Sequence, residues 1–219
     1  MMADQALERN CSAVLQRTEY AGKTHPMIRR FLSLLSFMAL MGCHHNLSPQ
    51  DVNISGLVPD LAFSMTDTQT ATPVSQTDFR GKVILLYFGY TNCPDVCPAT
   101  LYNIDRILQR LGPLTAKVRI LFVTVDPDRD TPSVLNQYTA LFGPNIIGLR
   151  GNADQLYALA RRYRVVFSVT KKPTYQVTHS AAVYVFNAAG KPQFIIAGLD
   201  TASPDIAGIA ADLKDVAQQ

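Results

Sequence analysis

The sequence predicts an α/β sandwich, in which a central mixed sheet lies between flanking helices. Three observations lead to this fold class. The chain alternates between apolar, β-branched runs that are typical of strands and amphipathic runs that are typical of helices. Two of the strand-like runs, 83–88 and 118–125, have the composition of strands covered on both faces. With 219 residues, 47% of them apolar and 17% charged, one domain of ordinary size is expected, and the sequence shows no internal repeat or low-complexity segment.

Each element follows from a local pattern. Apolar runs bounded by polar residues or glycine predict strands, and a proline or capping residue before an amphipathic run predicts a helix. A hairpin of 61–64 and 72–75 over a polar turn is expected before the central strand. The further expected strands are 83–88, 118–125, 146–149, 165–169, 177–186 and 193–197. The expected helices are 98–111, 131–142, 153–163 and 204–216.

The run V-I-L-L-Y-F-G-Y-T-N-C-P-D-V-C-P, at 83–98, joins the central strand to the first helix. Pro98 suits the first turn of a helix, and it biases Cys97 away from helical dihedral angles. Cys93 and Cys97 are therefore expected in a loop, with both sulfurs above the helix N-terminus. On a regular helix the same spacing would hold the two thiols too far apart for a relaxed disulfide.

This position favours redox or metal chemistry at the two cysteines. It lies beyond the carboxyl end of a central strand, where open α/β sheets place their sites. A helix N-terminus lowers the pKa of thiols, so both cysteines are expected to ionise near neutrality, and a soft thiolate pair favours Cu(I). Two packed apolar cysteines or a structural disulfide are the alternatives, and the polar, proline-rich loop argues against both.

The run F-G-Y-T-N-C-P-D-V-C-P resembles the signature of the Sco/SenC family. V-D-P-D-R-D-T at 125–131 and V-T-H-S at 177–180 resemble the other two motifs of that family, and the likeness spans about 58–217. The resemblance implies a thioredoxin-like fold and a copper-binding protein that assists assembly of the copper site of cytochrome c oxidase. Asn92 and Thr178 stand where the family usually has His and often has Asp, and neither is an implied ligand.

The resemblance also implies the copper ligands. Cys93, Cys97 and His179 would form a Cys₂His set for Cu(I), and the sequence leaves open whether Cu(II) is also held. A single histidine is more often a hydrogen-bonded surface residue. His179, however, opens the expected strand 177–186, at the place where thioredoxins carry a cis-proline that faces their cysteine pair.

Four aspartates lie near these motifs. Asp126 ends the strand 118–125 and is expected either to orient a loop of the site or to be solvated. Asp95 is interpreted as a hydrogen-bond acceptor in the loop or as a contact to a partner protein. Asp128 and Asp130 are expected in a solvated turn, where they also favour the positive end of the next helix.

Three functions compete for the cysteine pair. A copper metallochaperone would be reduced by a thiol reductant protein and would pass copper to cytochrome c oxidase or to another cuproprotein. A membrane-tethered thiol–disulfide oxidoreductase would use Cys93 or Cys97 as nucleophile, and the spacing of three residues instead of two weakens this hypothesis. A peroxidase would need a threonine three residues before its cysteine, whereas Thr91 lies two before Cys93. Copper delivery is favoured, so a chaperone is expected rather than an enzyme.

The charge pattern argues against a nucleic-acid partner. The net charge is +3, and the residues after 42 carry 15 Lys and Arg against 14 Asp and Glu. No basic patch of the kind that binds phosphate backbones is present in the sequence.

Residues 1–42 are expected to be an N-terminal extension followed by a lipoprotein-type signal. From Met27, the expected natural start, M-I-R-R precedes an apolar run shorter than the ~20 residues of a spanning helix. L-M-G-C resembles a bacterial lipoprotein cleavage box with Cys43 as the lipidated residue, and an uncleaved anchor is the alternative. A polar tether, 43–57, would then hold the domain 58–219 at the periplasmic side of the membrane.

Overall fold

The computed structural model describes residues 47–219. The expected start at Met27, the export signal and the lipidation of Cys43 lie outside the described residues and stay predictions. Within the described range, no helix combines the length and the apolar character that a membrane span requires.

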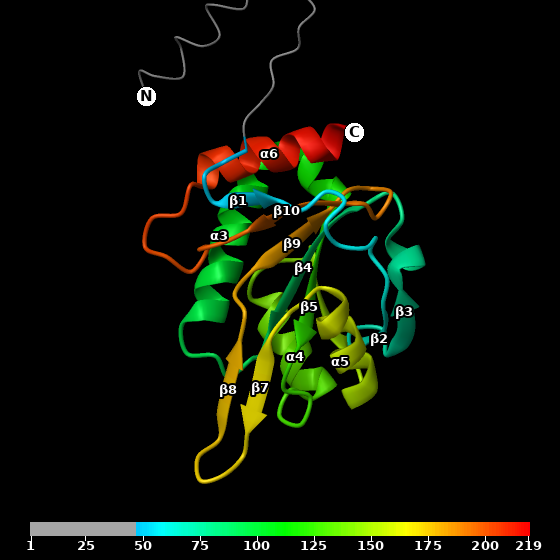
Figure 1. The fold of residues 1–219 in the computed structure, drawn as a ribbon, viewed down its shortest axis with the longest axis vertical. Helices are drawn as coiled ribbons and strands as arrows, with labels where there is room; N and C mark the ends of the chain where they lie inside the picture. The colour runs from blue at the N-terminus through cyan, green and yellow to red at the C-terminus, as the bar shows by residue number, and fades with distance from the viewer. Residues whose placement is uncertain (1–46) are drawn as a thin grey trace, which may run out of the picture. The chain divides into compact units, whose positions relative to one another are not determined.

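The core of the fold is one mixed sheet. Its strands are β1 (Asp51–Asn53), β2 (Ser64–Asp67), β3 (Thr72–Ser75), β4 (Val83–Gly89), β5 (Val118–Thr124), β6 (Ile146–Arg150), β9 (Val183–Phe186) and β10 (Pro192–Ile196). They lie in the order β1-β10-β9-β4-β5-β6-β2-β3. The central strands β4, β5 and β6 are parallel, and antiparallel strands extend the sheet on both sides (Figure 1).

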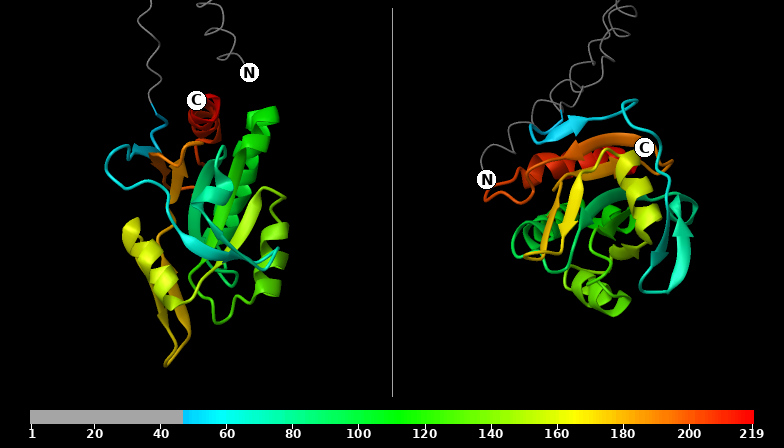
Figure 2. Two further views of the ribbon diagram at one scale, coloured as in Figure 1. Left: turned by 90° about the vertical axis from the view of Figure 1, so that its right-hand side faces the viewer. Right: turned by 60° about the horizontal axis from the view of Figure 1, so that its bottom comes forward.

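Helices cover both faces of this sheet. The α-helices of the described part are α3 (Val96–Leu111), α4 (Pro132–Ala140), α5 (Ala153–Arg162) and α6 (Ile206–Gln218). Figure 2 shows α3, α4 and α6 on one face and α5 on the other. Two 3₁₀ helices, η1 (Gln76–Phe79) and η2 (Gly112–Lys117), precede β4 and β5. Every residue of β4 is buried as a result, and the predicted α/β sandwich is confirmed.

Two helices begin where their capping residues predict. The Thr131 side chain accepts a hydrogen bond from the Val134 N–H, and Pro132 occupies the first helical position. Asn152 and Gln155 exchange side-chain and backbone hydrogen bonds in a capping box at the start of α5. These signals act over a few residues, so the sequence alone is sufficient to place them.

The first strand of the expected hairpin is shifted. It runs over 64–67 instead of 61–64, although Leu61 and Phe63 are buried as their apolar character suggests. The Leu61 N–H donates to the carbonyl of Gly190, and the Phe63 N–H donates to the side chain of Gln76. Because both N–H groups bond outside the ladder, the chain joins the sheet only after Phe63.

The expected tether is folded from residue 48 onward, which corrects that part of the domain prediction. Residues 51–53 form β1, which pairs with β10 at the edge of the sheet. Ser48 is buried, and its N–H donates to Asp212 Oδ2 at 2.7 Å. The side-chain partners of Ser48 lie 164 and 157 residues further along the chain, so the polar composition of this short segment does not predict where it packs.

The expected strand 177–186 is two strands. β8 (Gln176–His179) pairs with β7 (Phe167–Thr170) in a separate two-stranded sheet, whereas β9 belongs to the main sheet. The burial pattern changes at the break, because β8 alternates between exposed and half-buried residues and β9 is wholly buried. His179 therefore ends a short strand and does not open a long one.

Two buried carboxyl groups, one on β1 and one on α6, make stability depend on pH. Asp51 and Asp212 are both buried, and burial together with Asp212 and Asp205 raises the pKa of Asp51 to about 8. Unfolded Asp51 ionises near its ordinary pKa of about 3.9. The stability that the protonated Asp51 provides is therefore complete below about pH 4 and is lost as pH rises through about 8.

We expect Asp51→Asn to stabilise the protein by about 2 kcal/mol at pH 8 and by less at pH 5. The amide of asparagine does not ionise, so the variant no longer carries the cost of a buried charge beside Asp212. Urea unfolding at the two pH values measures the difference, and the exposed Asp215→Asn in α6 is the matched control, with little change at either pH. An equal loss of stability at both pH values for Asp51→Asn would contradict the assignment.

Candidate metal centre

The cysteine segment leaves the sheet at Gly89, the last residue of β4. A Cβ atom at this position would lie 2.7 Å from the Phe122 ring and 3.0 Å from the Cys97 sulfur. Only glycine allows this approach, because Cβ contacts below 3.0 Å force neighbouring atoms to move. The glycine that separates the strand from the cysteines thus seats the Cys97 sulfur against the core.

Cys97 lies inside the first turn of α3, which corrects the expectation of a loop through Cys97. The helix begins at Val96 with Asp95 as its N-cap, two residues before the predicted start. Pro98 is tolerated at the third helical position because the first N–H groups of a helix have no intrahelical partner. Cys93 remains in the loop, and its sulfur accepts a hydrogen bond from the Cys97 N–H at 3.3 Å. Cys93 therefore takes the place of a side-chain cap.

His179 completes a three-residue cluster with the two cysteines. The donor atoms of Cys93, Cys97 and His179 all lie within 4.8 Å of one another, and both cysteines carry free thiols. His179 Nε2 is 3.3 Å from the Cys97 sulfur, and His179 Nδ1 is 2.9 Å from the carbonyl oxygen of Ser180. A carbonyl only accepts, so Nδ1 carries the proton and the Nε2 lone pair points toward the sulfur atoms. A backbone carbonyl fixes metal-bound histidines in the same way.

Burial determines whether the Cys97 thiol and the His179 imidazole carry a proton when no metal is bound. It raises the pKa of the Cys97 thiol to about 12, more than the hydrogen bonds from Tyr90 and Tyr87 lower it. The expectation that helix α3 ionises both thiols near neutrality is therefore wrong for Cys97. Burial also lowers the pKa of His179 below its ordinary value, so the imidazole is neutral at pH 7. A metal ion that binds here must displace the Cys97 proton and meets a histidine that is ready to coordinate.

Asp130 is buried at the site, which overturns the expectation of a solvated turn. Its carboxylate accepts hydrogen bonds from the Thr91 N–H at 3.1 Å, the Thr91 hydroxyl at 2.6 Å and the Thr124 hydroxyl at 2.5 Å. Thr91 lies in the loop that leads to Cys93, and Thr124 ends β5. Asp130 therefore ties the cysteine loop to the end of the neighbouring strand.

The other aspartates divide as follows. Asp126 is buried, forms an ion pair with Arg129 and accepts a hydrogen bond from the Tyr175 hydroxyl, so it is not solvated, and its role in orienting a loop of the site stays a prediction. Asp128 is exposed, in agreement with the solvated turn, and pairs with Lys171. Asp95 is exposed, and within the described residues its side chain accepts no hydrogen bond from an N–H group at the start of α3. A contact between Asp95 and a partner protein therefore stays a prediction.

Sequence reasoning missed several residues around the centre. Tyr87 on β4 lies beside Cys97, and its hydroxyl lowers the pKa of that thiol. Tyr90 meets the His179 ring edge to face, with ring centres 5.6 Å apart. Arg129 lies over the ring of Tyr175 at 3.9 Å. Tyr90 and Arg129 stand within the quoted motifs and Tyr175 does not, and the contacts among these residues join segments that are distant in sequence. By contrast, Asn92 and Thr178, the two departures from the family pattern, are exposed.

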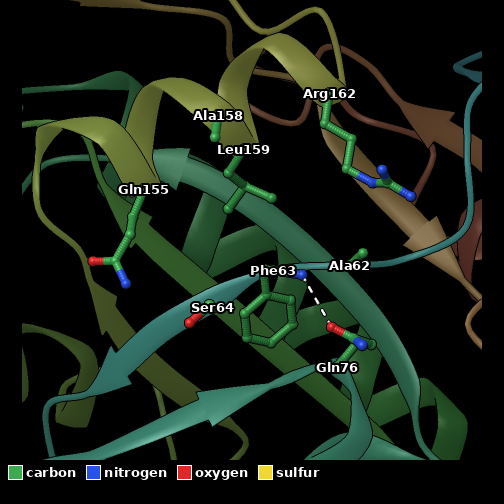
Figure 3. A pocket seen from close by; sticks show the side chains of 8 residues that line it. All are labelled: Ala62, Phe63, Ser64, Gln76, Gln155, Ala158, Leu159 and Arg162. Carbon is green, nitrogen blue, oxygen red and sulfur yellow. Dashed lines mark hydrogen bonds between the residues drawn. The ribbon is translucent and has the colours of Figure 1, made fainter.

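A cavity of about 440 Å³ lies elsewhere, between α5 and the start of β2 (Figure 3). Three of its polar side chains are already engaged. Gln76 Oε1 accepts from the Phe63 N–H, Gln155 Oε1 accepts from the Asn152 N–H, and Arg162 donates to the Asp60 carbonyl. None of the cysteine–histidine residues lines it. This cavity is therefore separate from the cysteine–histidine cluster.

The mixed sheet is covered by helices on both faces, and two thiols at the start of one helix lie beside an imidazole from a neighbouring hairpin. These features define a protein of the thioredoxin-like class. The family model described as SCO1/SenC matches residues 59–218. The chain belongs to this SCO1/SenC family. The resemblance in the cysteine, V-D-P-D-R-D-T and V-T-H-S motifs is thereby confirmed.

Solved structures and curated relatives agree with this assignment. Copper-bound ScoI of Bradyrhizobium japonicum is 34% identical, with a TM-score of 0.61 over 72% of this chain and 98% of that one. Copper-bound yeast Sco1 is 28% identical, with a TM-score of 0.64 over 74% of this chain and 90% of that one. The thioredoxin-like fold is confirmed by these neighbours.

Among curated proteins, an SCO2-like protein of Rickettsia felis is 33% identical over 150 residues, 67% of this chain and 70% of that protein. The mitochondrial SCO2 homologue of Bos taurus is 41% identical over 120 residues, 52% of this chain and 45% of that protein. The chain spans about half the length of several curated relatives that it matches. Relatives of this chain thus occur in bacteria and in mitochondria.

Proposed function

We propose that this protein is a copper chaperone that binds Cu(I) through Cys93, Cys97 and His179 and delivers it during assembly of the copper site of cytochrome c oxidase. The observation that carries the proposal is the cluster of two free thiols and an imidazole whose donor atoms lie within 4.8 Å. Family membership and copper-bound relatives support the same metal.

The donor set suits Cu(I) better than a structural zinc ion. Cu(I) is a soft ion that thiolates select, whereas structural zinc sites are closed by four ligands. No fourth Cys, His, Asp or Glu joins the cluster within residues 47–219. A site with three donors, one of them on a hairpin, can also release its ion to a receiving protein. Cu(II) is a second state that the imidazole would favour.

Thiol–disulfide exchange is the second candidate function. Two free thiols at the start of a helix on a thioredoxin-like fold favour it, and oxidation to a Cys93–Cys97 disulfide would be the copper-free state. The high pKa of Cys97 counts against this residue as the attacking thiolate, and the burial of both cysteines limits the access of a second protein to the sulfur atoms. Copper binding therefore ranks first, with exchange limited to resetting the pair by a thiol reductant protein.

The place of action is part of the proposal. The signal-like residues after Met27 and the L-M-G-C box support a lipid anchor on Cys43 and a domain on the periplasmic side of a bacterial membrane. The receiving protein would be the copper-site subunit of cytochrome c oxidase or another cuproprotein. Radiolabelled palmitate that enters wild type but not Cys43→Ser would support the anchor.

We expect the reduced protein to bind one Cu(I) tightly and His179→Ala to bind it about 10- to 100-fold more weakly, since two thiolates remain. Competitive Cu(I) titration measures this in a full chain whose Cys11 and Cys43 are serine, which confines thiol ligands to the site. Thr178→Ala, an exposed neighbour of His179, is the matched control and should bind as wild type does. Equal affinities of His179→Ala and wild type would remove His179 from the ligand set. Thioredoxin-like disulfide reduction without copper retention would reverse the ranking of the two functions.

A further inference from the structure

The hairpin that carries His179 stands apart from the main sheet. Within the described residues, β7 and β8 pair only with each other, and Phe167 lies opposite His179. Figures 1 and 2 show this hairpin projecting from the body of the domain. A two-stranded hairpin alone is marginally stable in water. The position of His179 therefore depends on the contacts that fix the hairpin to the domain.

The contacts to the distal part of the hairpin come from the loop that follows β5. The Tyr175 hydroxyl donates to Asp126 Oδ1 at 2.5 Å, and Arg129 Nε pairs with Asp126 Oδ2. The Arg129 guanidinium also lies 3.9 Å from the centre of the Tyr175 ring. The Asp126 side chain is only 1% exposed, so Arg129 has to compensate its buried negative charge. Asp126 Oδ1 keeps its hydrogen bond only while the Tyr175 hydroxyl lies against it.

The same guanidinium reaches toward the metal centre. Arg129 lies 5.9 Å from the centre of the Tyr90 ring, which meets the His179 ring at 86°. The Tyr90 carbonyl accepts a hydrogen bond from the Cys93 N–H at 3.3 Å. Tyr175, Arg129, Tyr90 and His179 thus form a continuous row of ring and guanidinium contacts, and Tyr90 in this row belongs to the loop that leads to Cys93.

We propose that Asp126, Arg129 and Tyr175 form a clamp that holds the β7–β8 hairpin closed and thereby positions His179 over the two thiols. This inference rests on the proposed copper function and assigns positioning residues to it. The neighbouring Lys171–Asp128 pair is not part of the clamp, because both side chains are more than half exposed and such pairs contribute little. With the clamp broken, His179 leaves the thiols for part of the time and Cu(I) loses its third donor.

The test measures Cu(I) release to an excess of chelator by stopped-flow absorbance, in the full chain with Cys11 and Cys43 replaced by serine. Tyr175→Ala removes the ring and the hydroxyl and should release Cu(I) about 10-fold faster. Tyr175→Phe keeps the ring under Arg129 and should release it about 3-fold faster. Lys171→Ala, a change in the same turn of the hairpin, should leave the rate unchanged. A wild-type rate for Tyr175→Ala would overturn the proposal.

A double-mutant cycle separates positioning from general loosening. If Tyr175 acts through His179, Tyr175→Ala should cause no further acceleration in the His179→Ala protein. The same acceleration in both backgrounds would overturn the clamp, because the effect would then bypass His179.

A second measurement needs no copper and keeps failure of the clamp distinct from failure of the copper function. The ¹⁵N order parameters of the β8 amides in the reduced, metal-free protein should fall in Tyr175→Ala and stay unchanged in Lys171→Ala. Unchanged order parameters in Tyr175→Ala would overturn the clamp whether or not the wild type binds copper. A wild type that fails to retain Cu(I) would overturn the chaperone function, and the order parameters would still decide the clamp.

Discussion

Replacement of Cys97 by serine is expected to abolish tight Cu(I) binding, with a loss on the order of a thousandfold or more, because a hydroxyl does not replace a soft thiolate donor. Cys93→Ser should have a similar effect, since one sulfur and one imidazole remain in each case. The loss should exceed that of His179→Ala, which leaves both thiolates. Competitive Cu(I) titration of the reduced variants, compared with Thr178→Ala, ranks the three ligands.

The Cu(I) affinity measured in this titration should depend on pH in a direction that the structure predicts. The pKa of Cys97 is raised to about 12, so its thiol is protonated at neutral pH and Cu(I) must displace that proton. Cu(I) affinity should therefore rise with pH between about 7 and 9, and Cys97→Ser should have a smaller slope. The His179 pKa is lowered, so this residue adds no slope in that range. A wild-type affinity independent of pH would contradict the buried, protonated thiol.

The sequence is sufficient for features that depend on short stretches of chain. The buried strand β4 follows from its continuous apolar run, and the starts of α4 and α5 follow from Thr131 and Asn152. The cluster of Cys93, Cys97 and His179 was expected from motifs that resemble a family, and the structure brings the three together. Their role as ligands remains a proposal that the titration tests.

Near the cysteines, two predictions from local rules failed because packing against the core outweighed the local preference. The bias of a residue before proline predicted a loop at Cys97, yet the helix begins at Val96. The helix N-terminus predicted an ionised thiol, yet the 0% exposure of Cys97 makes desolvation the larger effect. In both cases the local rule is valid, but packing of the sulfur against the core outweighs it.

Long-range pairing accounts for the other errors. Ser48 is held by a hydrogen bond to Asp212, and β1 is held by its pairing with β10. No local sequence pattern encodes either contact. Asp130 shows the same limit at the site. It and Asp128 look alike in the run D-P-D-R-D-T, but only Asp130 faces Thr91 and Thr124 across the loop. The fold around the motif, and not its composition, makes one aspartate structural and the other solvated.

This difference gives a matched pair of variants. Asp130→Ala should lower the free energy of unfolding by about 3 kcal/mol, because it leaves the Thr91 N–H and two hydroxyl groups without their buried acceptor. Asp128→Ala removes only an exposed ion pair and should cost at most about 1 kcal/mol. Urea unfolding of the reduced, metal-free proteins measures both changes.

The Asp130 contacts also predict an effect at the metal centre. Thr91 is two residues before Cys93, so loss of its acceptor should loosen the loop that places this sulfur over the Cys97 N–H. Cu(I) affinity of Asp130→Ala should therefore fall while that of Asp128→Ala stays at the wild-type level, measured at a temperature where both variants are folded. Equal stability and equal Cu(I) affinity of the two variants would show that the buried carboxylate does not support the cysteine loop.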